Sequence, residues 1–225
     1  MASQLVLELP HMPALGGEDF LVSTANETAV KLVASWPNWT NPICIITGPE
    51  GCGKTHLVNV WRARSGAAAF SAPAIKDAIA SALAEPQPVA IEDIDDGRLD
   101  EHGAFHLLNL ARERRFDILI TGRTPPGSWD IALPDLRSRL RSAAWLPIEE
   151  PDDALLRAVL VKLFADRQLA VGPEVIDYVM PRIERSMASA ARLVDALDKA
   201  ALAERRGITR PLAAKVLGAG RGWGH

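Results

Sequence analysis

The sequence predicts an α/β domain built on a parallel sheet, followed by a small all-helical domain. Short β-branched segments alternate with helical patterns up to residue 149, and this alternation is typical of a parallel sheet covered on both faces. From residue 150 onwards only helical patterns follow. We therefore expect an extended arm at 1–17, the α/β domain at 18–149, the helical domain at 150–218 and a flexible tail at 219–225.

The expected strands are short apolar runs, and those at 43–47, 89–94 and 117–121 are rich in valine and isoleucine, as suits a buried sheet. They lie at 43–47, 67–70, 89–94, 117–121 and 145–148. Segments with apolar residues at helical spacing precede, separate and follow them. The expected helices lie at 24–36, 55–64, 74–84, 101–114, 136–141, 152–168, 173–184 and 186–206. A further short helix is expected after Thr209, because Pro211 suits a first helical turn.

Composition narrows the class of protein. The chain has 225 residues, 48% of them hydrophobic, and a net charge of −3, which argues against nucleic-acid binding through bulk electrostatics. Only two cysteines occur, as expected in a reducing compartment. The apolar runs are too short to cross a bilayer, and the N-terminus does not read as a signal peptide. These features predict a soluble cytoplasmic protein with no membrane association.

The segment GPEGCGKT fits the phosphate-binding pattern G-x-x-x-x-G-K-[ST] and lies between an expected strand and an expected helix. Glycines let backbone N–H groups turn toward a phosphate, Lys54 brings positive charge, and the Thr55 hydroxyl can ligate Mg²⁺. A glycine-rich turn without a ligand is the alternative, although the GKT ending disfavours it. The candidate nucleotide-binding residues here are Gly48, Pro49, Glu50, Gly51, Cys52, Gly53, Lys54, Thr55 and His56.

A second acidic segment, VAIEDID, supplies carboxylates at the end of another expected strand. In a parallel sheet these side chains would face the phosphate-binding loop. We expect Glu92 to ligate Mg²⁺ together with Thr55, and Asp93 to take part in catalysis. The acidic turn Asp95-Asp96-Gly97 alone would be an ordinary turn. The expected ligand is therefore a nucleotide with Mg²⁺.

Four segments occur in the order and at the spacing found in AAA+ ATPases: GPEGCGKT, VAIEDID, DILITGRTPP and LPDLRSRL. From FLVSTANETA to the last helix, the chain resembles the family of the bacterial replication initiator DnaA and its shorter regulatory relative Hda. The resemblance implies an AAA+ three-layer nucleotide-binding domain with a parallel sheet and a small helical lid, and places ATP or ADP between them. The chain departs from the family at Glu92, where aspartate is usual.

The resemblance also implies roles for single residues. Thr121 corresponds to sensor 1, next to Arg123, where relatives often carry an acidic residue. Arg139 corresponds to an arginine finger that acts in trans, on nucleotide held by a neighbouring subunit. Arg185 corresponds to sensor 2 in the lid, with Arg182 and Arg192 as alternatives. The adenine pocket would include Phe20, Leu21 and Val22.

The implied function is that of an Hda-like regulator, which binds ATP or ADP and the DNA polymerase III sliding clamp (β subunit) and stimulates ATP hydrolysis by DnaA. The hexapeptide QLVLEL resembles a clamp-binding motif, with Gln4, Leu5, Leu7 and Leu9 as the contact residues. A full initiator of this family continues into a helix-turn-helix DNA-binding domain, whereas this sequence ends soon after Thr209. We therefore expect no sequence-specific DNA binding. Monomer and homodimer both remain open, as does weak intrinsic ATPase activity. The alternatives are a helicase-loader or transposition-helper ATPase that binds single-stranded DNA, and a nucleotide-gated adaptor that hydrolyses nothing.

Overall fold

A five-stranded parallel sheet forms the centre of the first part of the molecule in the computed structural model, which describes residues 21–219. The strand order is β2-β3-β4-β1-β5. The strands are β1 (Ile43–Thr47), β2 (Ala68–Ser71), β3 (Val89–Glu92), β4 (Ile118–Gly122) and β5 (Ala144–Pro147). Because the strands are parallel, all their carboxyl ends meet at one edge, where ligands bind in open α/β sheets.

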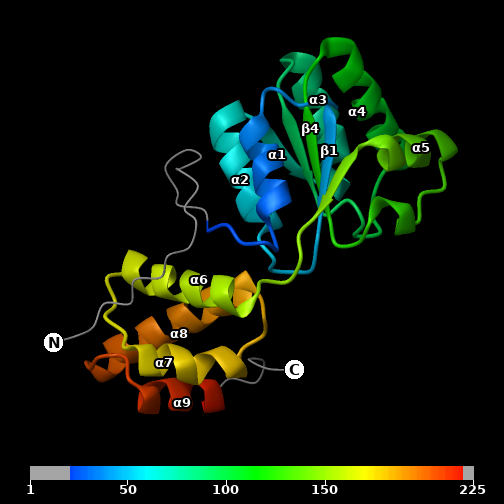
Figure 1. Ribbon diagram of the computed structural model, residues 1–225. Coiled ribbons are helices and arrows are strands. Elements are labelled where there is room, and N and C mark those ends of the chain that lie inside the picture. The colour runs from blue at the N-terminus through cyan, green and yellow to red at the C-terminus, as the bar shows by residue number, and fades with distance from the viewer. Residues whose placement is uncertain (1–20, 220–225) are drawn as a thin grey trace.

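Helices cover both faces of this sheet (Figure 1). One face carries α1 (Glu27–Ser35) and α2 (Lys54–Ser65), and the other carries α3 (Ile75–Ala84), α4 (Glu101–Arg114) and α5 (Pro134–Ser142). Two separate apolar clusters fill the spaces between sheet and helices. The sheet therefore has a helix layer on each side, as the sequence predicts for an AAA+ three-layer domain.

The second part of the molecule is entirely helical over its described residues and lies beyond the end of β5 (Figure 1). It consists of α6 (Asp153–Asp166), α7 (Pro173–Val179), α8 (Met187–Glu204) and α9 (Arg210–Ala219). The side chains of Asp152 and Ser186 cap α6 and α8 by accepting hydrogen bonds from the N–H groups of Leu155 and Ser189. The four helices share one apolar core, which includes Leu160.

The fold class is thus confirmed, with small shifts in the element limits. The strand expected to reach residue 94 ends at Glu92, because Asp93 adopts a left-handed conformation (φ 53°). The helix expected at 173–184 ends at Val179 and continues as a 3₁₀ turn, Met180–Arg182, since Pro181 lacks the N–H that an α-helix would use. The other 3₁₀ turns are Ala72–Ala74 and Pro126–Ser128.

Some expectations fall outside the described residues. These are the arm at 1–17 with its four candidate clamp contacts, the adenine-pocket candidate Phe20, and residues 220–225 of the tail. Within residues 21–219, none of the helices combines the length and apolar character that a membrane span requires.

Candidate nucleotide-binding site

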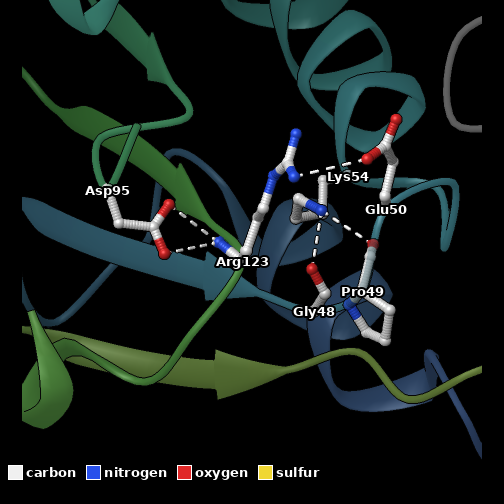
Figure 2. Close-up of polar contacts among 6 residues, drawn as sticks. All are labelled: Gly48, Pro49, Glu50, Lys54, Asp95 and Arg123. Atoms are coloured by element: carbon white, nitrogen blue, oxygen red, sulfur yellow. Dashed lines mark hydrogen bonds and ion pairs between the residues drawn. The ribbon is translucent and has the colours of Figure 1, made fainter. Parts of the chain in front are cut away.

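The phosphate-binding loop joins the end of β1 to the start of α2, where the sequence predicts it. Gly51 and Gly53 have φ values of +74° and +108°, which side-chain-bearing residues rarely adopt. Gly48 is required for space, because a Cβ there would lie 2.4 Å from the carbonyl oxygen of Ile148. The Lys54 side chain is buried, and its Nζ donates hydrogen bonds to the carbonyl oxygens of Gly48 (2.7 Å) and Pro49 (2.9 Å) (Figure 2).

The ends of β3 and β4 bring the acidic segment and the candidate sensor 1 to the same edge. The Thr55 hydroxyl donates a 2.7 Å hydrogen bond to Glu92 Oε2, so the two expected Mg²⁺ ligands lie side by side. The backbone N–H of Asp93 donates to Thr121 Oγ1 at 3.1 Å. Thr121 is 1% exposed, and in this arrangement its hydroxyl fixes the turn after β3.

A cavity of about 310 Å³ opens beside the loop. Its lining comes from the loop and the start of α2, from the ends of β3 and β4, and from the start of α8 in the helical part. The lining residues are Glu50, Gly51, Gly53, Lys54, Thr55, His56, Asp93, Arg123, Met187 and Ala188. Pro49, Cys52, Thr121 and Glu92 are close in sequence or structure but are not part of this lining.

The helical part meets the loop through the first turn of α8. The Met187 N–H donates a 2.7 Å hydrogen bond to the carbonyl oxygen of Gly51, and Ala188 Cβ packs against the same glycine. Arg185 does not line the cavity, and its guanidinium pairs with Asp153 at 2.9 Å. Its assignment as sensor 2 stays a prediction.

The two alternative lid arginines are also engaged within the helical part. Arg182 lies over the Tyr178 ring at 4.0 Å and donates to the Tyr178 carbonyl oxygen. Arg192 donates to Ser189 Oγ and pairs with Glu184. All three arginines therefore have partners inside the lid.

Arg123 is a site residue that the sequence analysis did not assign to the nucleotide. It follows β4, lines the cavity, and pairs with Glu50 of the loop at 3.3 Å (Figure 2). Its backbone N–H donates to both carboxylate oxygens of Asp95. Partial burial acts to raise the pKa of Asp95, but hydrogen bonds from Arg123 and Thr124 outweigh it and hold that pKa below its ordinary value. The sequence signal was available, since Arg123 lies two residues after the end of an expected strand.

The cysteine of the loop is not a reactive thiol. Cys52 is 3% exposed, and burial raises its pKa, with Lys54 opposing this effect. Its Sγ packs beside Gly48, where it would be 2.8 Å from an added Cβ. Cys52 therefore serves as a small apolar residue that shapes the loop.

The geometry fits a nucleotide with Mg²⁺. The loop provides left-handed glycines, a lysine and a helix N-terminus, which together suit phosphate oxygens. Within residues 21–219, histidine, cysteine and acidic side chains form no group of three or more that could hold a metal by itself. A Mg²⁺ site here would consist of Thr55 and Glu92, with phosphate oxygens and water completing the ligands.

Arg139 lies away from this cavity, in the last turn of α5 on the face opposite α1 and α2 (Figure 1). Its guanidinium is 4.8 Å from the centre of the Phe105 ring of α4. Arg139 also lines a second cavity, of about 340 Å³, together with Arg112 of α4 and residues before and at the start of β1. The start of β1 is the opposite end from the phosphate-binding loop, so Arg139 does not face the chain's own nucleotide site.

The adenine-pocket candidates are only partly described. Val22 is 4% exposed and packs in the apolar cluster of α1 and α2. The Leu21 carbonyl oxygen accepts a 3.0 Å hydrogen bond from Asn26 Nδ2. Neither residue is among those that line the 310 Å³ cavity, so their contact with adenine stays a prediction.

Comparisons with known proteins now place the two parts of the chain. Residues 153–217 match the family model described as the Hda lid domain. The lid is of the Hda type. A curated relative, an uncharacterised protein of Haemophilus influenzae, is 27% identical over 188 residues, which are 78% of this chain and 81% of that protein.

The chain also shares its fold with solved structures of DnaA and RuvB. Domain III of the replication initiation protein DnaA from Thermotoga maritima has a TM-score of 0.76 at 17% identity, covering 93% of this chain and 98% of that one. AMPPCP-bound DnaA from Aquifex aeolicus has a TM-score of 0.65 at 21% identity, covering 85% and 66%. The RuvB Holliday junction branch migration motor of Thermotoga maritima has a TM-score of 0.68 at 18% identity, covering 86% and 69%.

The match of residues 153–217 confirms an Hda-type lid, and the structural likeness confirms that the whole chain has the fold seen in DnaA. The structure brings together the loop, Glu92, Asp93 and the start of the lid at one edge of the sheet. It leaves Arg185 in an ion pair within the Hda-type lid and Arg139 on a distant face. The individual roles of these residues therefore remain proposals.

Proposed function

We propose that this protein binds ATP or ADP with Mg²⁺ and regulates DnaA in the manner of Hda. In this proposal the N-terminal arm binds the DNA polymerase sliding clamp, and the protein then stimulates ATP hydrolysis by DnaA, which limits initiation of replication in the cytoplasm. The position of Arg139 is the single observation that carries the proposal. A cation on the α4–α5 face, away from the chain's own loop, is suited to act on a neighbour's nucleotide.

Binding of the chain's own nucleotide follows from the loop geometry. Backbone N–H groups of the loop and Lys54 Nζ would contact phosphate oxygens, and Lys54 would then give up its two carbonyl partners. Thr55 and Glu92 would hold Mg²⁺, which when bound neutralises charge on phosphate oxygens. Support comes from the solved DnaA structure that was obtained with AMPPCP, a nucleotide analogue.

The reaction in trans needs a cation that reaches the partner. Arginine stabilises charge that develops during phosphoryl transfer, and a finger of this kind accelerates hydrolysis by roughly 10³–10⁵-fold. Phe105 holds the Arg139 guanidinium half-buried on the surface, which keeps the side chain on the face that a partner would meet. In this arrangement the hydrolysed nucleotide belongs to DnaA, and the present chain supplies the arginine.

The decisive experiment compares Arg139→Ala with Arg141→Ala. Arg141 lies on the same helix, but its side chain bonds to the Gly127 carbonyl oxygen. ATP hydrolysis by the cognate DnaA is measured with clamp loaded on DNA. We expect Arg139→Ala to lose at least about 100-fold of the stimulation, and Arg141→Ala to stay near the intact protein. Unchanged stimulation by Arg139→Ala would overturn the proposal.

Clamp binding is tested separately, by a pull-down with the β clamp. The intact chain is compared with a chain lacking residues 1–10 and with a Leu7→Ala, Leu9→Ala double variant. Both altered chains should lose capture, because the leucines are the side chains that an extended peptide would place in apolar pockets. Equal capture of all three proteins would show that the arm is not the clamp contact. Tight binding of single-stranded DNA in a gel shift at physiological salt would instead favour the loader alternative.

A further inference from the structure

The chain after β4 lies against the beginning of the phosphate-binding loop. Gly122 is the register partner of Thr47, and its carbonyl oxygen accepts a 3.2 Å hydrogen bond from the Gly48 N–H. Arg123, the next residue, therefore leaves the sheet directly beside the loop. Its place among the cavity-lining residues follows from this register.

The backbone of Arg123 is held firmly, while its side chain is not. The Asp95 carboxylate accepts hydrogen bonds from the N–H groups of Arg123 and Thr124 and from the Thr124 hydroxyl, at 2.9–3.0 Å. In contrast, the Arg123 side chain is 60% exposed, and Glu50, its partner at 3.3 Å, is 79% exposed. An ion pair this exposed is weak, so another anion can replace Glu50 at little cost.

Positive charge at the cavity comes from the sheet side rather than from the lid. Among the described residues, the lid contributes only Met187 and Ala188 to the cavity lining. The lysine and the arginine of the lining, Lys54 and Arg123, come from the sheet side. The lid arginine nearest to this contact in sequence, Arg185, is not among the lining residues. Arg123 is thus the cation placed to add to Lys54 at this site.

We propose that Arg123 is a phosphate-contacting residue of the nucleotide site, and that Glu50 is its competing partner when no nucleotide is bound. The inference rests on the proposed nucleotide binding. On binding, the Arg123 guanidinium would leave Glu50 for phosphate oxygens, which carry more negative charge and accept bidentate hydrogen bonds. Glu50 then remains beside the phosphates as an uncompensated anion and lowers affinity.

The test measures dissociation constants for fluorescent ATP and ADP analogues, with Mg²⁺. Arg123→Ala should weaken binding by roughly tenfold, the scale of a lost charge-assisted contact, and Arg123→Lys should recover part of it. Glu50→Gln should tighten binding a few-fold, and this gain should disappear in the Glu50→Gln, Arg123→Ala double variant. Arg98→Ala serves as a matched control, since Arg98 is 73% exposed and pairs with Asp96 outside the cavity lining.

The outcomes separate this inference from the proposed function. If the intact protein binds nucleotide and Lys54→Ala does not, but Arg123→Ala binds normally, then Arg123 does not contact phosphate while the nucleotide site stands. If the intact protein binds no nucleotide, the proposed function fails and the role of Arg123 fails with it. Thermal unfolding without nucleotide should be the same for the Arg123 and Glu50 variants as for the intact protein, because both side chains are exposed.

Discussion

The edge of the sheet at the phosphate-binding loop and the α4–α5 face around Arg139 are organised in different ways. At the loop, the shape of the site is set mainly by backbone conformation. Two left-handed glycines and the carbonyl oxygens that hold Lys54 lie within six residues of one another. At the α4–α5 face, side chains from separate elements meet, with Arg139 of α5 over Phe105 of α4. Local sequence therefore determines the first region, and tertiary packing determines the second.

Under the proposed function, the two regions have separate tasks. The loop edge is shaped to hold a ligand inside the chain, between sheet and lid. The α4–α5 face presents arginines outward, next to a cavity that no lid covers in the described residues. Substitutions in one region should therefore leave the task of the other intact; the first three predictions probe the loop edge, and the last compares the two regions directly.

The largest expected effect is that of Lys54→Ala on nucleotide affinity. Removing a buried, hydrogen-bonded cation costs roughly 2–5 kcal/mol, or about 30-fold to several-thousand-fold in affinity. Calorimetric titration with ADP and Mg²⁺ measures it, with Lys162→Ala as control, since Lys162 pairs with Asp166 in the lid. Nucleotide affinity within threefold of the intact protein would contradict the assignment of the loop.

A substitution at Gly48 should act on stability as well as on binding. The added Cβ of Gly48→Ala would meet Ile148 O at 2.4 Å and Cys52 Sγ at 2.8 Å, so the free energy of unfolding should fall by about 1–3 kcal/mol. Gly127→Ala is the matched control, because nothing lies within 4 Å of its Cβ position. Urea unfolding measures both, and equal stability of the two variants would show that the loop yields easily.

Asp95→Asn should loosen the turn that carries Arg123. The charged carboxylate accepts hydrogen bonds from the Arg123 and Thr124 N–H groups, and an amide oxygen accepts them more weakly. The free energy of unfolding should therefore fall by about 1 kcal/mol at neutral pH, after allowance for solvent screening. Because the pKa of Asp95 is held below its ordinary value of 3.8, its contribution is present above that pH and is lost as the pH falls through the folded-state pKa. Urea unfolding from pH 7 to pH 3 should therefore show the difference between the two proteins shrinking at the acid end. A constant difference across that range would rule out a charge-dependent contribution.

The smallest expected effect belongs to Phe105. Phe105→Leu removes the ring beneath Arg139, a contact worth about 0.5–1 kcal/mol, while Phe105→Tyr keeps it. The concentration of protein that gives half-maximal stimulation of DnaA should rise about two- to fivefold for the leucine variant only. Nucleotide affinity of the chain itself should not change, and a change there would break the separation of the two regions.

Sequence reasoning reached most of the fold because the signals are local. The β-branched run Ile43–Thr47 and the loop after it were predicted with their correct limits, since apolar pattern and glycine placement encode them directly. The pairing of Arg123 with Glu50 was not predicted, because it depends on the β1–β4 register. Likewise, the ion pair of Arg185 with Asp153 depends on how the lid helices pack, which periodicity alone does not reveal.

The hydrogen bond from the Met187 N–H to the Gly51 carbonyl oxygen joins the first turn of α8 to the phosphate-binding loop. The Met187 amide proton exchanges with solvent when this hydrogen bond is broken. Its exchange rate therefore reports how often the first turn of α8 separates from the loop. Gly51 also belongs to the loop that would receive phosphate. Ligand binding and lid opening would therefore both act on the Met187–Gly51 hydrogen bond. Hydrogen–deuterium exchange at Met187 thus measures lid opening without a partner protein and without catalysis.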